Sequence, residues 1–175
     1  VLESSRIFDG RDFLVFEDDH YSFDAHFRAA ATLAHRLVED FGVVKGERVA
    51  IAMRNYPEWS IAFWAAAAVG AVLVPLNAWW TGAELEYGLE DSGATVVFVD
   101  QERLDRLRPH LANLPKVRAV IVARAADRAT PPAGARHFDA VVGRVEDEVE
   151  LPPAEIDPED DATIFYTSGT TGRSK

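Results

Sequence analysis

The chain has 175 residues, of which 48% are apolar and 27% are charged, and its formal net charge is −11 at pH 7. This length and composition suit one soluble globular domain, or a piece of a larger protein, with a sizeable core. The absence of cysteine excludes disulfides and thiolate metal sites and is compatible with a cytoplasmic origin, and the acidic balance disfavours nucleic acid as a partner.

The chain is predicted to begin with two short strands, at 13–16 and 21–23, joined by the acidic turn 17–20. Ser22 is suited to cap the helix that follows. Apolar residues then recur at helical spacing until Gly42, which is predicted to end the helix. No cationic segment followed by an apolar one opens the chain, so we predict no signal peptide.

Strands and helices alternate through the middle of the chain. Four apolar runs without alternation predict buried strands at 48–53, 71–76, 94–99 and 117–123. Three helices are predicted between them. The first spans 57–70, the second begins with a capping box formed by Thr81 and Glu84 and ends at Gly93, and the third begins after Asp100. This order predicts the α/β class, with a mainly parallel sheet flanked by helices.

A stretch without any charged residue extends from position 59 to position 83, which is long enough to cross a bilayer. Gly70, Pro75 and Asn77 interrupt it, and its purely apolar part, 61–74, is only 14 residues long. That length fits a buried helix followed by a buried strand better than a membrane span. We therefore predict no transmembrane segment.

Regularity fades after Arg124, apart from a short helix that residues 140–143 are predicted to end. Residues 144–161 contain nine acidic residues and one arginine, so this segment carries −8 of the net charge of −11. It is interpreted as a solvated connector stiffened by prolines, and the alternative is an acidic docking segment.

The chain closes with a predicted strand at 162–167 that leads into a loop with the sequence TSGTTGRSK, residues 167–175. Ligands bind beyond the carboxyl ends of strands in open parallel sheets. Glycines there let backbone N–H groups converge on an anion, hydroxyls can donate to phosphate or ligate magnesium, and Arg173 and Lys175 add positive charge. The spacing of Gly169 and Gly172 is not that of a Walker loop. The alternative is a flexible Ser/Thr/Gly tail or linker.

The sequence YTSGTTGRSK, 166–175, resembles the phosphate-binding loop of the adenylate-forming (AMP-binding) superfamily, which includes acyl-CoA synthetases, luciferases and adenylation domains. Residues 43–94 and the stretch SFDAHFRAAATLAHRL, 22–37, are similar to the amino-terminal part of acyl-CoA synthetases. The resemblance covers about 20–123 and 161–175, and the two motifs occur in the same order as in the family.

The resemblance implies that 1–175 is the amino-terminal part of the large domain of an acyl-CoA synthetase, with an acidic connector at 144–161 and a phosphate-binding loop at 167–175. Such an enzyme activates an acid, here expected to be a fatty acid, with ATP and Mg²⁺ to an acyl-adenylate and transfers the acyl group to coenzyme A. The family's adenine pocket, acyl pocket, acidic metal ligand and carboxyl-terminal lysine all come after Lys175. The 175-residue chain alone is therefore expected to be inactive and to contain no catalytic residue.

The resemblance also implies roles for single residues of the loop. It implies phosphate contacts from Thr167, Ser168, Gly169, Thr170, Thr171 and Lys175. Thr167 is a candidate magnesium ligand, and Gly172 would serve the turn. The family usually has proline before the lysine, where this chain has Ser174, and serine is expected to leave the loop more mobile.

A second interpretation is a non-enzymatic α/β module, nucleotide-sensing or receiver-like, with the loop as a flexible tail. Sequence beyond Lys175 would discriminate between the two. The ligase interpretation implies a small carboxylic acid, ATP and CoA as partners. It leaves open a homodimer, peripheral contact with a membrane, and a carrier protein in place of CoA as the thiol.

Other residues whose side chains could bind a metal or a ligand have simpler explanations. The five histidines include no pair three or four residues apart, so we predict no metal site among them. The carboxylates at 17–19 are explained by a turn. Trp79 and Trp80 are candidates for an entry or partner surface, and we expect at least one to pack against the core.

Overall fold

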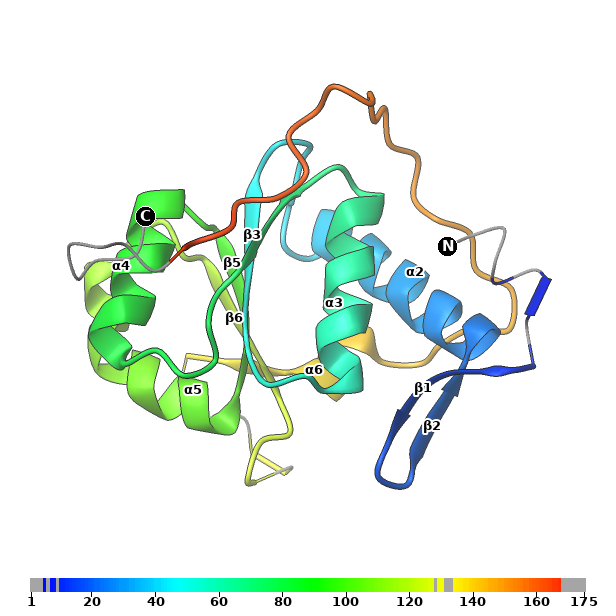
Figure 1. The fold of residues 1–175 in the computed structure, drawn as a ribbon, viewed down its shortest axis with the longest axis horizontal. Coiled ribbons are helices and arrows are strands. Elements are labelled where there is room, and N and C mark those ends of the chain that lie inside the picture. The colour runs from blue at the N-terminus through cyan, green and yellow to red at the C-terminus, as the bar shows by residue number, and fades with distance from the viewer. Residues whose placement is uncertain (1–4, 6, 9, 128, 131–133, 168–175) are drawn as a thin grey trace.

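The computed structural model describes residues 5, 7–8, 10–127, 129–130 and 134–167. A five-stranded parallel sheet forms the centre, and an antiparallel hairpin lies beside it (Figure 1). The sheet has the order β4-β3-β5-β6-β7. Its strands are β3 (Arg48–Ala52), β4 (Val72–Pro75), β5 (Val96–Asp100), β6 (Ala119–Ala123) and β7 (Arg136–His137). All four strand pairs are parallel, so the predicted α/β class and parallel sheet are confirmed.

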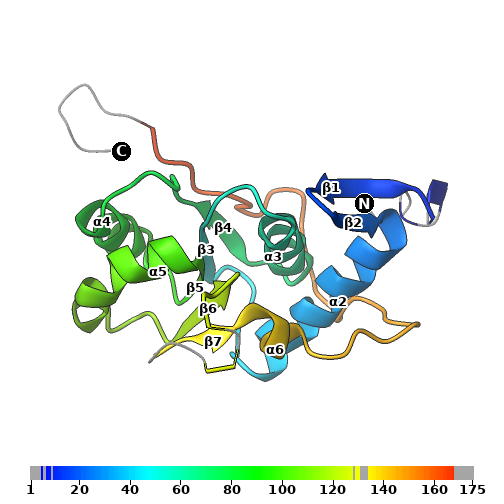
Figure 2. The same ribbon diagram turned by 90° about the horizontal axis from the view of Figure 1, so that it is seen from below.

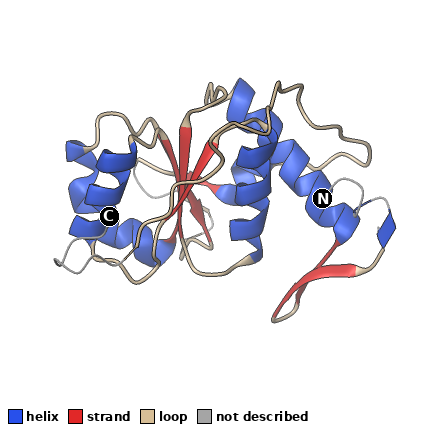
Figure 3. Cartoon of the chain, turned by 45° about the horizontal axis from the view of Figure 1, so that its top comes forward, coloured by secondary structure: helices blue, strands red, loops and turns tan. Residues whose placement is uncertain are grey.

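Helices cover both faces of the sheet, as Figure 3 shows. One face packs against α2 (Phe23–Glu39), α3 (Pro57–Ala68) and α6 (Phe138–Val142). The other face packs against α4 (Gly82–Ser92), α5 (Gln101–Leu107) and the 3₁₀ helix Arg108–Asn113. Side chains alternate between the two cores: Phe98 of β5 enters the first, and Val97 and Val99 enter the second. Both faces of β3, β4, β5 and β6 are therefore largely buried, which explains why these strand sequences lack alternation.

Local capping signals in the sequence correspond to observed helix starts. Ser22 Oγ accepts a hydrogen bond from Ala25 N at 3.1 Å. Thr81 and Glu84 form the predicted capping box at the start of α4, and Gly93 ends that helix with a φ of 66°. The helix α2 ends at Glu39, three residues before the predicted stop, and α3 ends two residues earlier than predicted. The short helix predicted to end within 140–143 extends from Phe138 to Val142.

The amino-terminal hairpin consists of β1 (Asp12–Phe16) and β2 (Asp19–Ser22). The second strand begins two residues earlier than predicted, so the turn is confined to Glu17 and Asp18. Glu17 has a φ of 52°, in the left-handed region that residues other than glycine rarely adopt. The hairpin packs on the start of α2 through the tilted ring pair of Phe13 and Phe23, 4.7 Å apart.

The predicted strand at 162–167 is wrong in extent. It makes one parallel bridge, between Thr163 and Leu73 of β4. Leu73 N donates to Ala162 O at 2.9 Å, and Leu73 O accepts from Ile164 N at 2.8 Å. The next residue of β4 that faces this segment is Pro75, which has no N–H to donate. The ladder therefore ends after one bridge.

The acidic segment 144–161 contains no helix or strand and passes along α2 before it returns to β4, in orange and red in Figure 1. Among the described residues, three polar contacts join it to the body of the protein. Arg28 Nη1 lies 3.2 Å from Asp147 Oδ1, His35 Nε2 lies 3.0 Å from Glu150 O, and Lys45 Nζ lies 2.6 Å from Asp160 Oδ2. The segment is thus a largely exposed strap. Across the described part of the chain, no helix is both long and apolar enough to span a bilayer.

Candidate functional site

The predicted phosphate-binding loop begins at the carboxyl side of the sheet. Because the bridge between Thr163 and Leu73 is parallel, 162–167 runs in the same direction as the strands. Figure 2 shows this segment passing over β4 toward α4. Thr167, the first predicted loop residue, is exposed at its end. The other predicted site residues lie outside the described part of the chain: Ser168, Gly169, Thr170, Thr171, Gly172 and Lys175.

Tyr166 attaches the start of this loop to helix α4. Its hydroxyl lies 2.7 Å from Asp91 Oδ2, to which it donates, and 3.2 Å from Gly88 O. Burial, and then the hydrogen bond to the Asp91 carboxylate, hold the pKa of Tyr166 well above its usual range. The phenol therefore stays protonated and remains a donor at physiological pH. Sequence reasoning missed this role, because the two partners are 75 residues apart.

An aromatic group surrounds that attachment. The ring of Tyr166 meets Trp80 edge-on, with centroids 5.6 Å apart, and lies 6.4 Å from the ring of Tyr87. Trp80 is buried, so the expectation that one of the paired tryptophans packs in the core is confirmed. Gly88 makes room for it: a Cβ at Gly88 would lie 2.8 Å from Trp80 Cζ3. The loop thus starts from a packed surface of α4.

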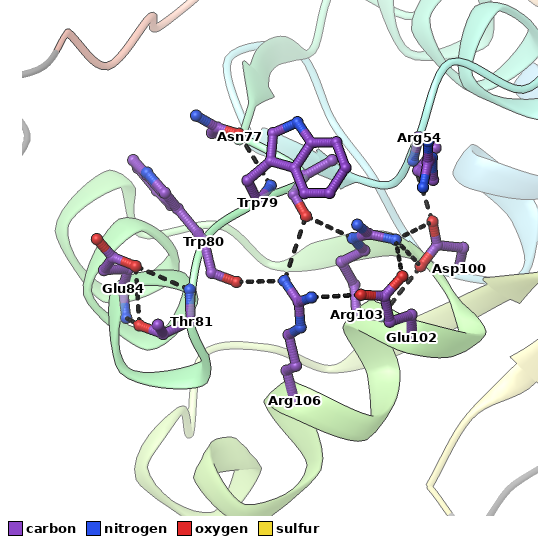
Figure 4. A network of polar contacts seen from close by, with 11 residues as sticks. Arg54, Asn77, Trp79, Trp80, Thr81, Glu84, Asp100, Glu102, Arg103 and Arg106 are labelled. Atoms are coloured by element: carbon purple, nitrogen blue, oxygen red, sulfur yellow. Dashed lines mark hydrogen bonds and ion pairs between the residues drawn. The ribbon is translucent and has the colours of Figure 1, made fainter.

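A buried ion pair organises the carboxyl edge next to this surface, as Figure 4 shows. Asp100, at the end of β5, caps α5 by accepting from Arg103 N at 3.0 Å. The same carboxylate pairs with Arg103 Nη1 at 3.0 Å and accepts from Arg54 N at 3.0 Å. Both side chains of the pair are at most 5% exposed. Asp100 therefore joins the ends of β3 and β5 to the start of α5.

Two arginines of α5 hold the backbone that follows β4. Arg103 Nε donates to Ala78 O at 2.6 Å, and Arg106 Nη1 donates to Trp80 O at 2.9 Å. Glu102 pairs with both guanidinium groups. The ring of Trp79 nevertheless projects outward from this fixed backbone and is 69% exposed. Sequence reasoning identified the two tryptophans but could not tell which one is buried.

No group of three metal-ligating side chains occurs among the residues that the structure describes. His26 is buried and bonded to Ser60 Oγ at 3.0 Å. The role of Thr167 as a magnesium ligand stays a prediction. The described site consists of an anchored loop start beside an arginine-rich edge of the sheet.

Comparisons with known proteins connect this arrangement to a family. The family model described as AMP-binding enzyme matches residues 3–175. The chain is 31% identical over 156 residues to 4-coumarate–CoA ligase 2 of Oryza sativa subsp. japonica, with 85% of this chain and 26% of that protein covered. It is 32% identical over 155 residues to the long-chain-fatty-acid–CoA ligase FadD13 of Mycobacterium tuberculosis, with 86% and 28% covered.

A solved structure shows the same fold. The crystal structure of the anthranilate CoA ligase AuaEII in complex with anthranoyl-AMP superposes with a TM-score of 0.87 at 26% identity. The superposition covers 98% of this chain and 32% of that one. The chain thus spans about a quarter to a third of the length of the relatives that it matches.

Proposed function

The chain belongs to the family of AMP-binding enzymes, and from that membership we propose that it is part of an ATP-dependent acid–thiol ligase. In this reaction a carboxylate attacks the α-phosphate of ATP and forms an acyl-adenylate and pyrophosphate. A thiol, proposed to be that of coenzyme A, then displaces AMP. The chain is proposed to be the amino-terminal part of the large domain, and residues after Lys175 would complete the active site.

The observation that supports this proposal most strongly is the position of the loop start. Residues 162–167 run parallel to β4, and Tyr166 is bonded to α4, so the loop begins where open parallel sheets bind ligands. The residues from Thr167 onward combine hydroxyl donors, two glycines and Lys175, which suits the β- and γ-phosphates of ATP.

The donor set also fits a hard cation, because hydroxyl and phosphate oxygens are the ligands that Mg²⁺ prefers. Thr167 is the proposed protein ligand, from an exposed position at the end of the anchored segment. Bound Mg²⁺ would supply positive charge that stabilises the pyrophosphate as it leaves. The contribution of this chain is to position donors before reaction, so that little reorganisation is needed when negative charge develops.

We propose a fatty acid as the substrate. One named relative acts on long-chain fatty acids, while two others carry the names of aromatic acids. The two kinds of acid share an apolar body and a single carboxylate. An aromatic acid is therefore the second candidate.

The test is acid-dependent release of pyrophosphate by a longer protein that contains this chain, with ATP, Mg²⁺ and a panel of aliphatic and aromatic acids. We expect release with at least one acid and none without acid. The 175-residue chain alone should stay at background, because it spans about a third or less of its relatives. If the longer protein binds ATP but no acid stimulates release, the nucleotide-sensing module replaces the ligase as the better interpretation.

A further inference from the structure

A groove lies between the amino-terminal hairpin and the loop that joins β3 to α3. It has two adjoining parts, with volumes of about 340 and 530 Å³. The two parts share Phe16, Asn55 and Tyr56 in their lining. Volumes of this size are typical of sites for small molecules. The groove is separate from the loop start at Thr167, although both lie at the carboxyl edge of the sheet.

The smaller part of the groove is mainly apolar. Leu14 and Val15 of β1 form one wall, and Pro57 and Trp59 of α3 form the other. Val15 is 58% exposed, so its apolar surface is open to a ligand. The hydroxyl of Ser60, which also lines this part, is already bonded to His26. An aliphatic or aromatic body would therefore bury apolar surface here.

The larger part of the groove contains a cation. The guanidinium of Arg54 lies 5.1 Å from the ring centroid of Trp79, and both side chains line the groove (Figure 4). Within the described part of the chain, no carboxylate lies within 4.0 Å of this guanidinium; Glu17 lines the same space but does not reach it. Arg54 is exposed and thus has donors available for an anion.

Ion pairs and ring contacts of Arg124 hold the walls of the groove in place. Arg124 pairs with Asp19 of the hairpin at 2.6 Å and with Glu58 of α3 at 3.0 Å. Its guanidinium also covers the rings of Phe16 and Tyr56, each at 4.8 Å. Arg124 and Glu17 both have a positive φ, a conformation that persists only where surrounding contacts enforce it and that is frequent at ligand sites.

We propose that this groove binds an amphipathic carboxylate. The carboxylate accepts hydrogen bonds from Arg54 beside Trp79, and the apolar body lies between β1 and α3 along Val15 and Trp59. An apolar groove with one cation at its end that has no carboxylate partner among the described residues is complementary to a single negative charge on an apolar body. The binding itself does not rest on the proposed function, whose acyl pocket the family resemblance places after Lys175.

The test is a titration of a longer protein that contains this chain with decanoate, in the absence of ATP and Mg²⁺, followed by calorimetry and tryptophan fluorescence. Decanol is the neutral probe of the same length. We expect a saturable decanoate site that binds decanol more weakly. Arg54→Gln should weaken the binding of decanoate about tenfold, the loss expected for one charge-assisted hydrogen bond, and should change the binding of decanol little. Val15→Asp should weaken both probes.

Two matched variants control for charge and apolar surface elsewhere. Arg144→Gln removes a guanidinium that is 85% exposed, and Val44→Asp changes a valine that is 62% exposed. Both should bind decanoate as the wild type does. Equal binding of decanoate and decanol by the wild type, or non-saturable binding, would overturn the proposal even if a variant failed to fold. The phosphate-loop proposal would survive that result, because no nucleotide is present.

Discussion

Acid should loosen the junction between α2, α3 and the hairpin through His26. This ring is 1% exposed, its Nε2 lies 3.0 Å from Ser60 Oγ, and its centroid lies 4.6 Å from that of Phe13. Burial lowers the pKa of His26 from its ordinary value of 6.5 to about 4. As pH falls, the unfolded chain therefore binds a proton before the folded chain does. The stability that the neutral ring contributes is complete above pH 6.5 and is lost between pH 6.5 and 4.

The size of that loss follows from the shift. At about 1.4 kcal/mol per pKa unit, the free energy of unfolding should fall by about 3 kcal/mol on this account. Urea unfolding of the wild type and His26→Gln at pH 7, 6, 5 and 4 measures it, because glutamine keeps a polar partner for Ser60 and does not titrate. Between pH 7 and pH 4, the difference in the free energy of unfolding between the two proteins should shift by about 3 kcal/mol in favour of the variant.

The control is His20→Gln, since His20 has an exposed ring that is bonded to Asp12 at 3.1 Å. This variant should follow the pH dependence of the wild type. Parallel curves for the wild type and His26→Gln would refute the reasoning.

Three further substitutions test the site. Tyr166→Phe keeps the ring but removes the hydroxyl. It should lower the free energy of unfolding by about 1 kcal/mol and speed hydrogen exchange at 163–167, and unchanged exchange would show that the bond does not anchor the loop. Asp100→Asn leaves the buried Arg103 guanidinium with Glu102 as its carboxylate partner and should lower the free energy of urea unfolding by about 1–3 kcal/mol, whereas a change near zero would contradict the role of this pair. Gly88→Ala should cost about 1–3 kcal/mol because the new methyl meets an indole, and a neutral result would show that the helix can shift.

The elements that the sequence predicted are those with local causes. Apolar runs predicted the four main strands. The capping residues Thr81 and Asp100 predicted two helix starts, where each side chain accepts a short-range hydrogen bond. The extent of the strand at 162–167 depended instead on Pro75 of its partner, 88 positions before Thr163 in the chain. A strand prediction from one segment cannot include the missing donor of another.

The sequence suggested site chemistry only where that chemistry is contiguous. The glycine, hydroxyl and lysine content from Thr167 onward suggested an anion-binding loop or a flexible tail, and the resemblance to adenylate-forming enzymes implied the roles of single residues. The groove could not, because the contact between Arg124 and Asp19 joins residues 105 positions apart, and Trp79 was indistinguishable from its buried neighbour. Residues brought together by tertiary packing leave no periodic or compositional pattern.

The central claim is that the loop after Thr167 acts on the phosphates of ATP, and Lys175→Ala tests it most directly in a longer protein that contains this chain. The phosphates are present in the first step and have left before the second. The variant should therefore form acyl-adenylate about a hundredfold more slowly and use supplied acyl-adenylate at nearly the wild-type rate. Lys116→Ala, at an exposed lysine, should slow neither step. If Lys175→Ala is equally slow from supplied acyl-adenylate and from ATP plus acid, the loop does not have the role assigned to it.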